Sequence, residues 1–265
     1  MTAWLHSEPD NTCVKSPSIL HVMAWKRKRQ IVSPLISIPT HGSADDQLED
    51  DPTLADSKEP EMADSNPLID GIAKLFNNSD YADVKIYVGQ YELPAHSVVL
   101  ASQSPFFQKA LKGDFKEGKD KQFRFEEGSM HAHWRAFEYM YTGAYADEPT
   151  QVFDTPDDDE LVKHIRVYVI AEFFMLDDLK RLALQKFKLK LQNLWVSELF
   201  VACIREIYAS TTESEEGLRS AVVSVAYNYQ TELWQKKPFR DLIYDGGDFA
   251  VDLVGKYAAG KHRSR

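Results

Sequence analysis

The sequence predicts an α+β fold in which a small sheet and a cluster of α-helices precede an all-helical extension. Two observations lead to this prediction. Residues 83–126 contain short segments in which apolar and polar side chains alternate, and helical segments lie between them. From residue 131 onward, apolar residues recur at helical spacing in one segment after another. The 265 residues leave room for one or two domains with a sizeable core.

A helix and a strand pair begin this domain. Residues 67–76 carry an apolar helical face. In residues 83–89 apolar and polar side chains alternate, and Gly89 gives the turn into a second strand over residues 91–93. Pro94 has no amide hydrogen to donate, so we expect the second strand to end before it.

Helices are predicted on either side of one further strand. Ser104 before Pro105 is the usual start of a helix, a side-chain cap followed by a ring at the first helical position. Residues 122–126 alternate as a strand does, and residues 131–141 carry an apolar helical stripe that Gly143 ends.

The C-terminal half is predicted to be helical. Residues 161–176 are nearly apolar on all sides from residue 167 onward, which predicts a buried central helix. Further helical patterns follow at residues 179–187, 195–208, 215–229, 232–244 and 249–258. The last of these segments predict a small extension packed onto the domain. Trp195 and Trp234 suit either its core or an interface, and we favour the core.

An acidic loop precedes the central helix, over residues 154–160, and Pro149 and Pro156 interrupt regular structure around it. Consecutive Asp side chains on a loop usually hydrate. We therefore expect a solvated insertion rather than a metal site.

Residues 1–66 are predicted to be a disordered tail, because Ser, Pro, Asp and Glu dominate residues 40–66 and cannot bury enough apolar surface to offset the entropy of ordering. A basic cluster in this tail consists of Lys26, Arg27, Lys28 and Arg29. It is either a nuclear localisation signal or a solvated basic patch. Residues 31–38 are apolar but interrupted by Pro34, which leaves at most an edge strand or a short docking segment.

The composition narrows the class of protein. The net charge of −10 argues against a surface that attracts nucleic acid or membranes. Cys13 and Cys203 are too few and too distant for a disulfide framework, which favours a reducing compartment. No run of about 18 apolar residues predicts a membrane span, and residues 1–10 lack the features of a signal peptide. We therefore expect an intracellular protein, cytoplasmic, nuclear or both.

The order of these elements resembles that of a BTB/POZ domain, an α+β fold with a small mixed sheet and a cluster of α-helices. The residues that carry the resemblance are Asp83-Val84, Pro94-Ala95-His96, 99–107, 113–117 and 139–143, with 167–176 and 179–183 after a gap. The resemblance covers roughly residues 67–192 and leaves a tail over 1–66 and a helical extension over 193–265. The compact form also resembles the short BTB proteins of filamentous fungi.

Such domains are protein-interaction modules without an active site, so the resemblance implies a non-enzymatic protein without cofactors. The histidines fit this expectation. His131 and His133 are two residues apart and point to different faces of a helix, so they cannot chelate one ion together. His96 and His164 have no partners at zinc spacing, and His96 matches a structural histidine of the family motif. Cys203 lies on an apolar helical face, which predicts a buried side chain rather than a nucleophile.

The resemblance also suggests a cullin contact. In BTB adaptors for cullin-type ubiquitin ligases, a bulky apolar residue, any residue and then Glu follow the helical hairpin, and Phe115 and Glu117 stand at this place. The apolar side chain would fill a pocket and the carboxylate would fix the orientation on the cullin. The alternative places Phe115 in the core and leaves Glu117 as an ordinary exposed charge.

A second family site is a charged groove, which BTB repressors build from an Asp near the first strand and a basic residue after the Pro-Ala-His motif. Asp83 is present, but Ser97 stands where the basic residue would be. We therefore expect Asp83 to be buried and to bind nearby backbone amides and serine hydroxyls. The lack of a zinc-finger array also counts against a repressor.

Three functions remain open. The leading hypothesis is a protein-interaction module that serves as a substrate adaptor for a cullin-type ubiquitin ligase, with the tail or the extension holding the substrate. The alternatives are a homotypic or heterotypic scaffold and a nuclear regulatory factor, neither with a ligase role. The expected partners are a second copy, other BTB chains or a cullin. Because the residues before 67 are acidic and polar, an exchanged N-terminal strand is not favoured, and we expect a weak homodimer or a monomer.

Overall fold

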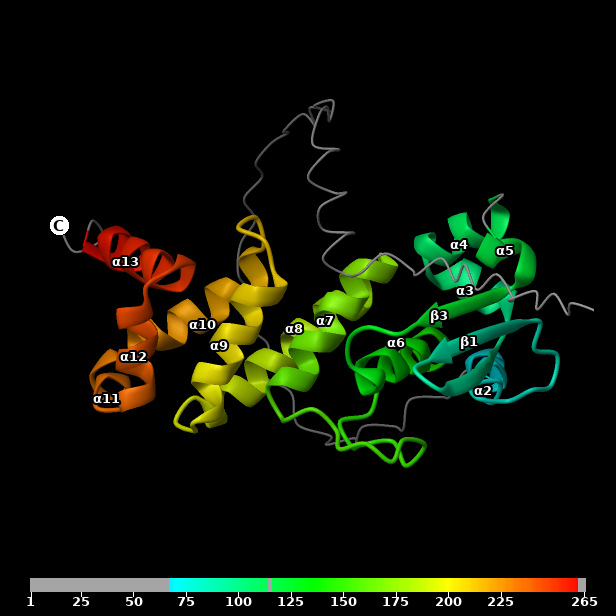
Figure 1. Ribbon diagram of the computed structural model, residues 1–265, viewed down its shortest axis with the longest axis horizontal. Coiled ribbons are helices and arrows are strands. Elements are labelled where there is room, and N and C mark those ends of the chain that lie inside the picture. Colours follow the sequence, from blue (N-terminus) through cyan, green and yellow to red (C-terminus); the bar gives the residue numbers. More distant parts are fainter. Residues whose placement is uncertain (1–66, 114–115, 262–265) are drawn as a thin grey trace, which may run out of the picture.

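A three-stranded mixed sheet lies at one end of the molecule (Figure 1). The computed structural model describes residues 67–113 and 116–261. The central strand is β1 (Val84–Val88). On one side it pairs antiparallel with β2 (Tyr91–Ala95), and on the other it pairs parallel with β3 (Gln122–Phe125). The alternating pattern of β1 buries its valine and isoleucine side chains, as predicted.

Pro94 does not end the second strand, so that prediction is wrong. Pro94 lies within β2 and pairs with Lys85 of β1. The N–H of Lys85 donates to the carbonyl of Lys121 on the other side. In an antiparallel pair, the ring nitrogen of Pro94 then faces away from β1. Because β2 is an edge strand, no ladder hydrogen bond is lost there.

Within the described ranges five helices accompany the sheet, and all but the short helix over residues 116–120 form where the sequence predicts helices. They are α2 (Pro67–Ala73), α3 (Ser97–Gln103), α4 (Pro105–Lys112), α5 (Lys116–Asp120) and α6 (Met130–Thr142). Ser104 caps α4, and its hydroxyl accepts from the N–H of Phe107 at 3.3 Å. Gly143 ends α6 in the left-handed region at φ 74°, where a residue without Cβ is least strained.

The predicted central helix is α7 (Val162–Phe174), which forms a hairpin with α8 (Asp177–Leu194). Most residues of α7 are buried, since α6 lies against it on one side and α8 and α9 (Leu199–Ser210) on the others. Because other helices cover α7 on all sides, a nearly continuous apolar sequence suits it.

The extension continues with α10 (Glu216–Asn228), α11 (Gln230–Trp234), α12 (Lys237–Asp245) and α13 (Asp248–Lys261). The prediction of one helix over residues 232–244 is wrong, because the chain turns between α11 and α12. Pro238 lies in the first turn of α12. Its ring would clash with the carbonyl four residues earlier in a continuous helix, and it has no N–H to donate.

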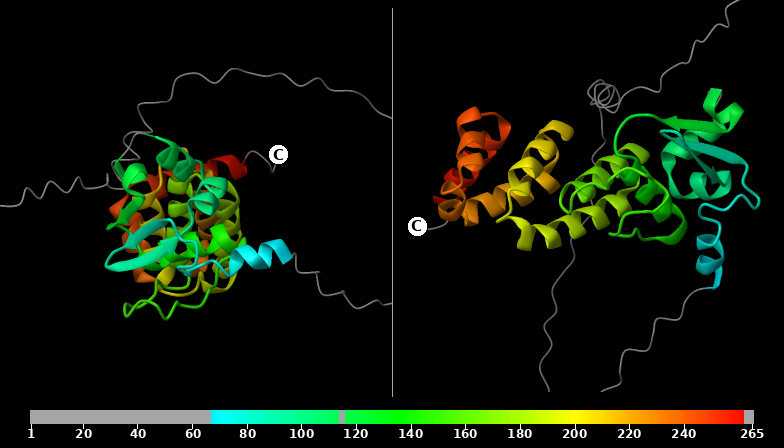
Figure 2. Two further views of the ribbon diagram at one scale, coloured as in Figure 1. Left: turned by 90° about the vertical axis from the view of Figure 1, so that its right-hand side faces the viewer. Right: turned by 60° about the horizontal axis from the view of Figure 1, so that its bottom comes forward.

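The extension and the sheet-bearing part share one core. The buried side chains form a continuous cluster that runs from β1 to Leu253 of α13. Polar contacts reinforce it: Glu215, before α10, accepts hydrogen bonds from the hydroxyl of Tyr168 on α7 and from Lys180 on α8. Figure 2 shows the sheet at one end of this body and the extension at the other.

Several predictions concern residues outside the described ranges. They are the disorder of residues 1–66, the basic cluster Lys26, Arg27, Lys28 and Arg29, and the position of Phe115. These stay predictions.

The shared core predicts that a cavity in the extension destabilises the whole body. Ile204 of α9 is fully buried, so Ile204→Ala is expected to lower the free energy of unfolding by about 2–5 kcal/mol. Urea unfolding followed by circular dichroism and by tryptophan fluorescence should show one common transition at lower urea.

The matched control is Val251→Ala on the exposed face of α13, which should change the free energy of unfolding by less than about 0.5 kcal/mol. Two separate transitions in Ile204→Ala, with only one of them shifted, would contradict a shared core.

Candidate protein-interaction site

The corner between α4 and α5 holds Glu117, one of the two residues predicted to contact a cullin. Glu117 lies in the first turn of the short helix α5 and is half-buried. Within the part of the chain that the structure describes, no hydrogen bond or ion pair engages its carboxylate. Its predicted companion Phe115 lies outside the described residues.

Gly118 fixes how α5 lies on α4. A Cβ atom at Gly118 would lie 2.1 Å from the carbonyl oxygen of Ala110, so only glycine allows this approach of the two backbones. The neighbouring Glu117 is therefore carried by a helix in direct contact with α4. Sequence reasoning missed Gly118, because it predicted no helix between residues 113 and 121 and a glycine there was no signal of close packing.

Asp83 connects three elements of the fold through its hydrogen bonds. Its carboxylate accepts from the N–H and the hydroxyl of Ser97, at 2.7 Å each, and from Lys121 at 2.6 Å. The bonds to Ser97 were predicted and are confirmed, whereas the expected burial is wrong because Asp83 is exposed. The contact with Lys121, which precedes β3, was not anticipated.

These contacts set the charge state of Asp83. Desolvation alone would raise its pKa, but the hydrogen bonds from Lys121 and Ser97 outweigh it and lower the pKa of Asp83 to about 2. Through these hydrogen bonds, the Asp83 carboxylate connects the starts of β1, α3 and β3. Its predicted role in a charged groove stays a prediction.

His96 is structural, as predicted. Its Nδ1 lies 3.0 Å from the hydroxyl of Tyr141, and its Nε2 lies 2.8 Å from the carbonyl of Asp80. Because a carbonyl only accepts, Nε2 carries the proton and donates. The ring thus connects the segment before β1 to α6.

A second surface lies on the first helices. The predicted apolar face of residues 67–76 is only partly buried: Ile72 and Phe76 contact the core, but Leu68 and Ile69 of α2 are exposed. Val98 of α3 is exposed as well. Exposed aliphatic side chains on these two helices are a candidate surface for self-association.

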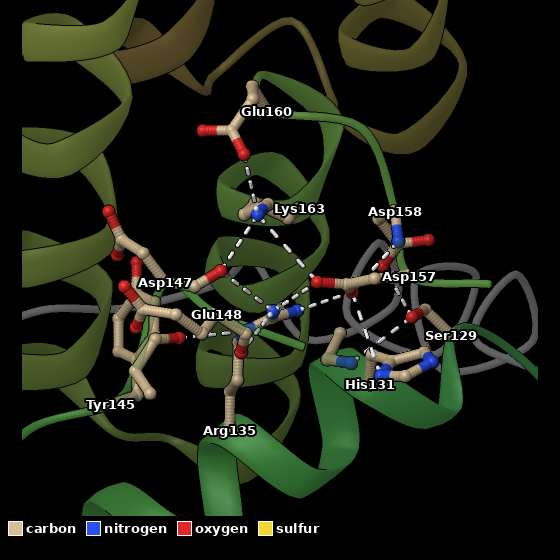
Figure 3. A network of polar contacts seen from close by, with 12 residues as sticks. Ser129, His131, Arg135, Tyr145, Asp147, Glu148, Asp157, Asp158, Glu160 and Lys163 are labelled. Carbon is tan, nitrogen blue, oxygen red and sulfur yellow. Dashed lines mark hydrogen bonds and ion pairs between the residues drawn. The ribbon is translucent and has the colours of Figure 1, made fainter. Parts of the chain in front are cut away.

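The acidic loop before α7 is not the solvated insertion that was predicted. Its Asp157 makes a bidentate ion pair with Arg135 of α6, with Nη–Oδ distances of 2.9 and 2.5 Å (Figure 3). The Arg135 and Asp157 side chains are only 3% and 10% exposed. Hydrogen bonds from Arg135 also reach the carbonyls of Ala146 and Glu148. The prediction failed because it considered the carboxylates without the cations on the helices beneath them.

Two further cations complete this buried cluster. Lys163 of α7 donates to the carbonyl of Asp147 at 2.8 Å and lies 3.6 Å from Asp157. Arg166 pairs with Asp158, which also accepts from Ser129 at the start of α6. The cluster holds the loop onto α6 and α7.

Because these carboxylates already have cationic partners, the cluster fits a structural role. Among the described residues, no group of His, Cys, Asp and Glu side chains is arranged to hold a metal ion. Cys203 is fully buried, as predicted, and desolvation raises the pKa of its thiol. No helix of the described ranges is long and apolar enough to cross a membrane.

Comparison with known proteins identifies a family model and distant relatives that match part of this chain. Residues 72–190 match the family model of the BTB/POZ domain. Human Kelch-like protein 28 is 33% identical over 79 residues, which make up 30% of this chain and 14% of that protein. BTB/POZ domain-containing protein 9 of Drosophila melanogaster is 32% identical over 91 residues, which make up 34% of this chain and 12% of that protein. The chain therefore spans only a small part of the length of the curated relatives it matches.

A solved structure shows a similar but more distant match. The BTB domain of human gigaxonin has a TM-score of 0.34 and 19% identity, and the match covers 48% of this chain and 98% of that chain.

Loss of the Asp157 charge is expected to destabilise the fold strongly. Asp157→Asn leaves Arg135 buried without its counter-ion, which typically costs about 3–5 kcal/mol. Desolvation would raise the pKa of Asp157, but the hydrogen bond and the positive charge of Arg135 outweigh desolvation and lower this pKa. Its contribution is therefore complete above the unfolded pKa of about 3.9 and is lost as the pH falls through the lower folded pKa.

Chemical denaturation of the wild type and Asp157→Asn from pH 7 to pH 3 checks this. The stability difference should be constant above about pH 5 and shrink below about pH 4. Asp154→Asn, which alters an exposed carboxylate of the same loop, is the control and should have little effect. A small difference at pH 7 would contradict the buried ion pair.

Gly118→Ala tests the contact between α4 and α5. The added methyl group must push the two backbones apart, at a cost of about 1–3 kcal/mol. Hydrogen exchange of the amides in α5 should become faster. Gly255→Ala is the control, since nothing lies within 4 Å of its Cβ position in α13, and it should stabilise by about 0.5–1 kcal/mol. Equal effects of the two substitutions would contradict the close approach.

Proposed function

We propose that this chain, which contains a BTB/POZ domain over residues 72–190, acts as a non-enzymatic substrate adaptor for a cullin-type ubiquitin ligase. The observation that carries the proposal is the place of Glu117. It lies on α5 directly after the α3–α4 helical hairpin, where the adaptor pattern has an apolar residue, any residue and then Glu.

The geometry of the corner supports this proposal. The contact of Gly118 with α4 fixes the helix that carries Glu117 before any partner arrives. A backbone held in place loses little conformational entropy on binding, which favours affinity. The Glu117 carboxylate has no partner within the described ranges, so it is available to a cationic or amide group of a cullin. Phe115, two residues earlier in the sequence, would supply the apolar anchor.

The buried polar groups support a role without catalysis. The carboxylates of the loop cluster are paired with Arg135 and Arg166, and His96 bridges two elements of the fold. The thiol of Cys203 is enclosed in the core and kept protonated at neutral pH by its raised pKa. These groups of the described ranges maintain the structure, and none of those named is free to act as a nucleophile or a base.

A homotypic scaffold is the second candidate, and the exposed side chains of Leu68, Ile69 and Val98 favour it. Two short helices provide little apolar area, whereas a stable dimer buries on the order of 1,200–2,000 Å². Self-association through this surface alone would therefore be weak. It is compatible with an adaptor role, because it uses different helices from the α4–α5 corner.

The adaptor role predicts a complex with the N-terminal domain of a cullin. Light scattering on a sizing column should show a heavier species when the full chain and the cullin domain are mixed at micromolar concentration. Phe115→Ala combined with Glu117→Ala should weaken the complex at least about 30-fold, which corresponds to the loss of a single hot-spot side chain that contributes about 2 kcal/mol.

Glu213→Ala is the matched control, because it removes an exposed carboxylate between α9 and α10 and should leave the complex unchanged. If no complex forms, or if the double variant binds as the wild type does, the adaptor role is wrong. The mass of the free protein would then show whether self-assembly remains.

A further inference from the structure

An apolar groove of about 460 Å³ is lined by α10, α11, α12 and α13. These helices lie at the far end of the molecule from the sheet (Figure 1). Phe239 and Leu253 form buried parts of its wall. Trp234, Ile243 and Val254 line it as well, and the polar groups come mainly from glutamine and threonine side chains. Such a lining suits an apolar chain segment that also presents a few backbone hydrogen-bonding groups.

The groove leaves large apolar side chains open to water. Trp234 is 45% exposed and Val254 is 66% exposed, so the preference for a core position of Trp234 is wrong. Tyr244 and Val251, on α12 and α13, extend the exposed apolar surface beyond these two residues. In contrast, Trp195 stacks on Tyr229 with 3.8 Å between ring centroids. Large apolar side chains exposed around an apolar groove are typical of an interaction surface.

The tail contains a segment whose chemistry matches this groove. Residues 31–38 read Ile-Val-Ser-Pro-Leu-Ile-Ser-Ile, five large aliphatic side chains among small polar ones. Pro34 disfavours a continuous helix or strand over this segment, so regular structure does not easily supply partners for all of its backbone N–H and C=O groups. The helices that line the groove carry as many basic as acidic side chains over residues 216–261, so apolar contact rather than charge would hold the segment.

The length of the connection to α2 bears on whether the groove binds the segment of its own chain or that of a second copy of the protein. The 28 residues from 39 to 66 connect it to α2. A chain of this length spans at most about 90–100 Å when fully extended and about 30 Å on average. Because α2 and α13 lie near opposite ends of the longest axis, binding within one molecule would stretch this connection at a cost in entropy (Figure 1). Binding between two molecules leaves this connection unstretched and costs translational and rotational freedom instead.

We propose that the groove formed by α10–α13 binds residues 31–38 of a second copy of this chain. The aliphatic side chains of the segment cover Trp234 and Val254, and the two copies associate through tail and groove. This interaction is independent of the cullin contact, since it uses the opposite end of the molecule.

Light scattering of the full chain over a range of micromolar concentrations tests the proposal with two substitutions. Val254→Glu places a charge in the groove, and its exposed position leaves the fold intact. Leu35→Asp places a charge in the tail segment. The controls are Leu189→Glu, at an exposed leucine of α8, and Leu54→Asp, at a leucine elsewhere in the tail.

The wild type and both controls should increase in mass with concentration. Val254→Glu and Leu35→Asp should each associate at least about tenfold more weakly. An equimolar mixture of these two variants should partly regain the association, because one supplies an intact tail and the other an intact groove. A wild type without concentration-dependent mass, or a Val254→Glu variant with the wild-type mass, would overturn the proposal.

Discussion

The helix α7 has to be covered on every side, and the rest of the structure follows from this constraint. Its sequence leaves almost no polar face, so α6 covers one side and α8 and α9 cover the others. At its C-terminal end, Phe174 joins an aromatic cluster with Phe107 and Phe125, and its carbonyl accepts from the Ser104 hydroxyl at 2.7 Å. The same serine caps α4, so the central helix and the helical hairpin are fixed by one side chain.

A continuous core has consequences for function. The sheet-bearing part and the extension are held together by apolar packing and by the contacts of Glu215 and Arg166 across α7, α8 and α9. The candidate interaction surfaces lie at the two ends of this core, at the α4–α5 corner and in the groove lined by α10–α13. Figure 2 shows that the sheet-bearing part and the extension lie at opposite ends of the molecule. Because the two surfaces lie at opposite ends, a cullin at the α4–α5 corner and the tail of a second copy in the groove could bind at the same time.

Periodicity in the sequence was enough to find the strands, the helix caps and the buried central helix, because each reports on local burial. It failed where the structure depends on contacts between distant residues. From the sequence alone, the acidic loop was expected to be hydrated. In the structure, Arg135 and Lys163, which come from two different helices, lie close to Asp157. Likewise, the pattern of residues 232–244 is helical throughout, and only the first-turn position of Pro238 shows why the helix is broken there. For the candidate site, the sequence indicated Glu117 but not Gly118, whose importance appears only when α4 lies against it.

The central claim is that the α4–α5 corner is the surface that a cullin contacts. Hydrogen exchange of the full chain, with and without the N-terminal domain of a cullin, tests it most directly. The account predicts slower exchange on binding in peptides that cover residues 105–121 and no change in α11–α13. Protection confined to other helices, or no protection at saturating cullin, would contradict it.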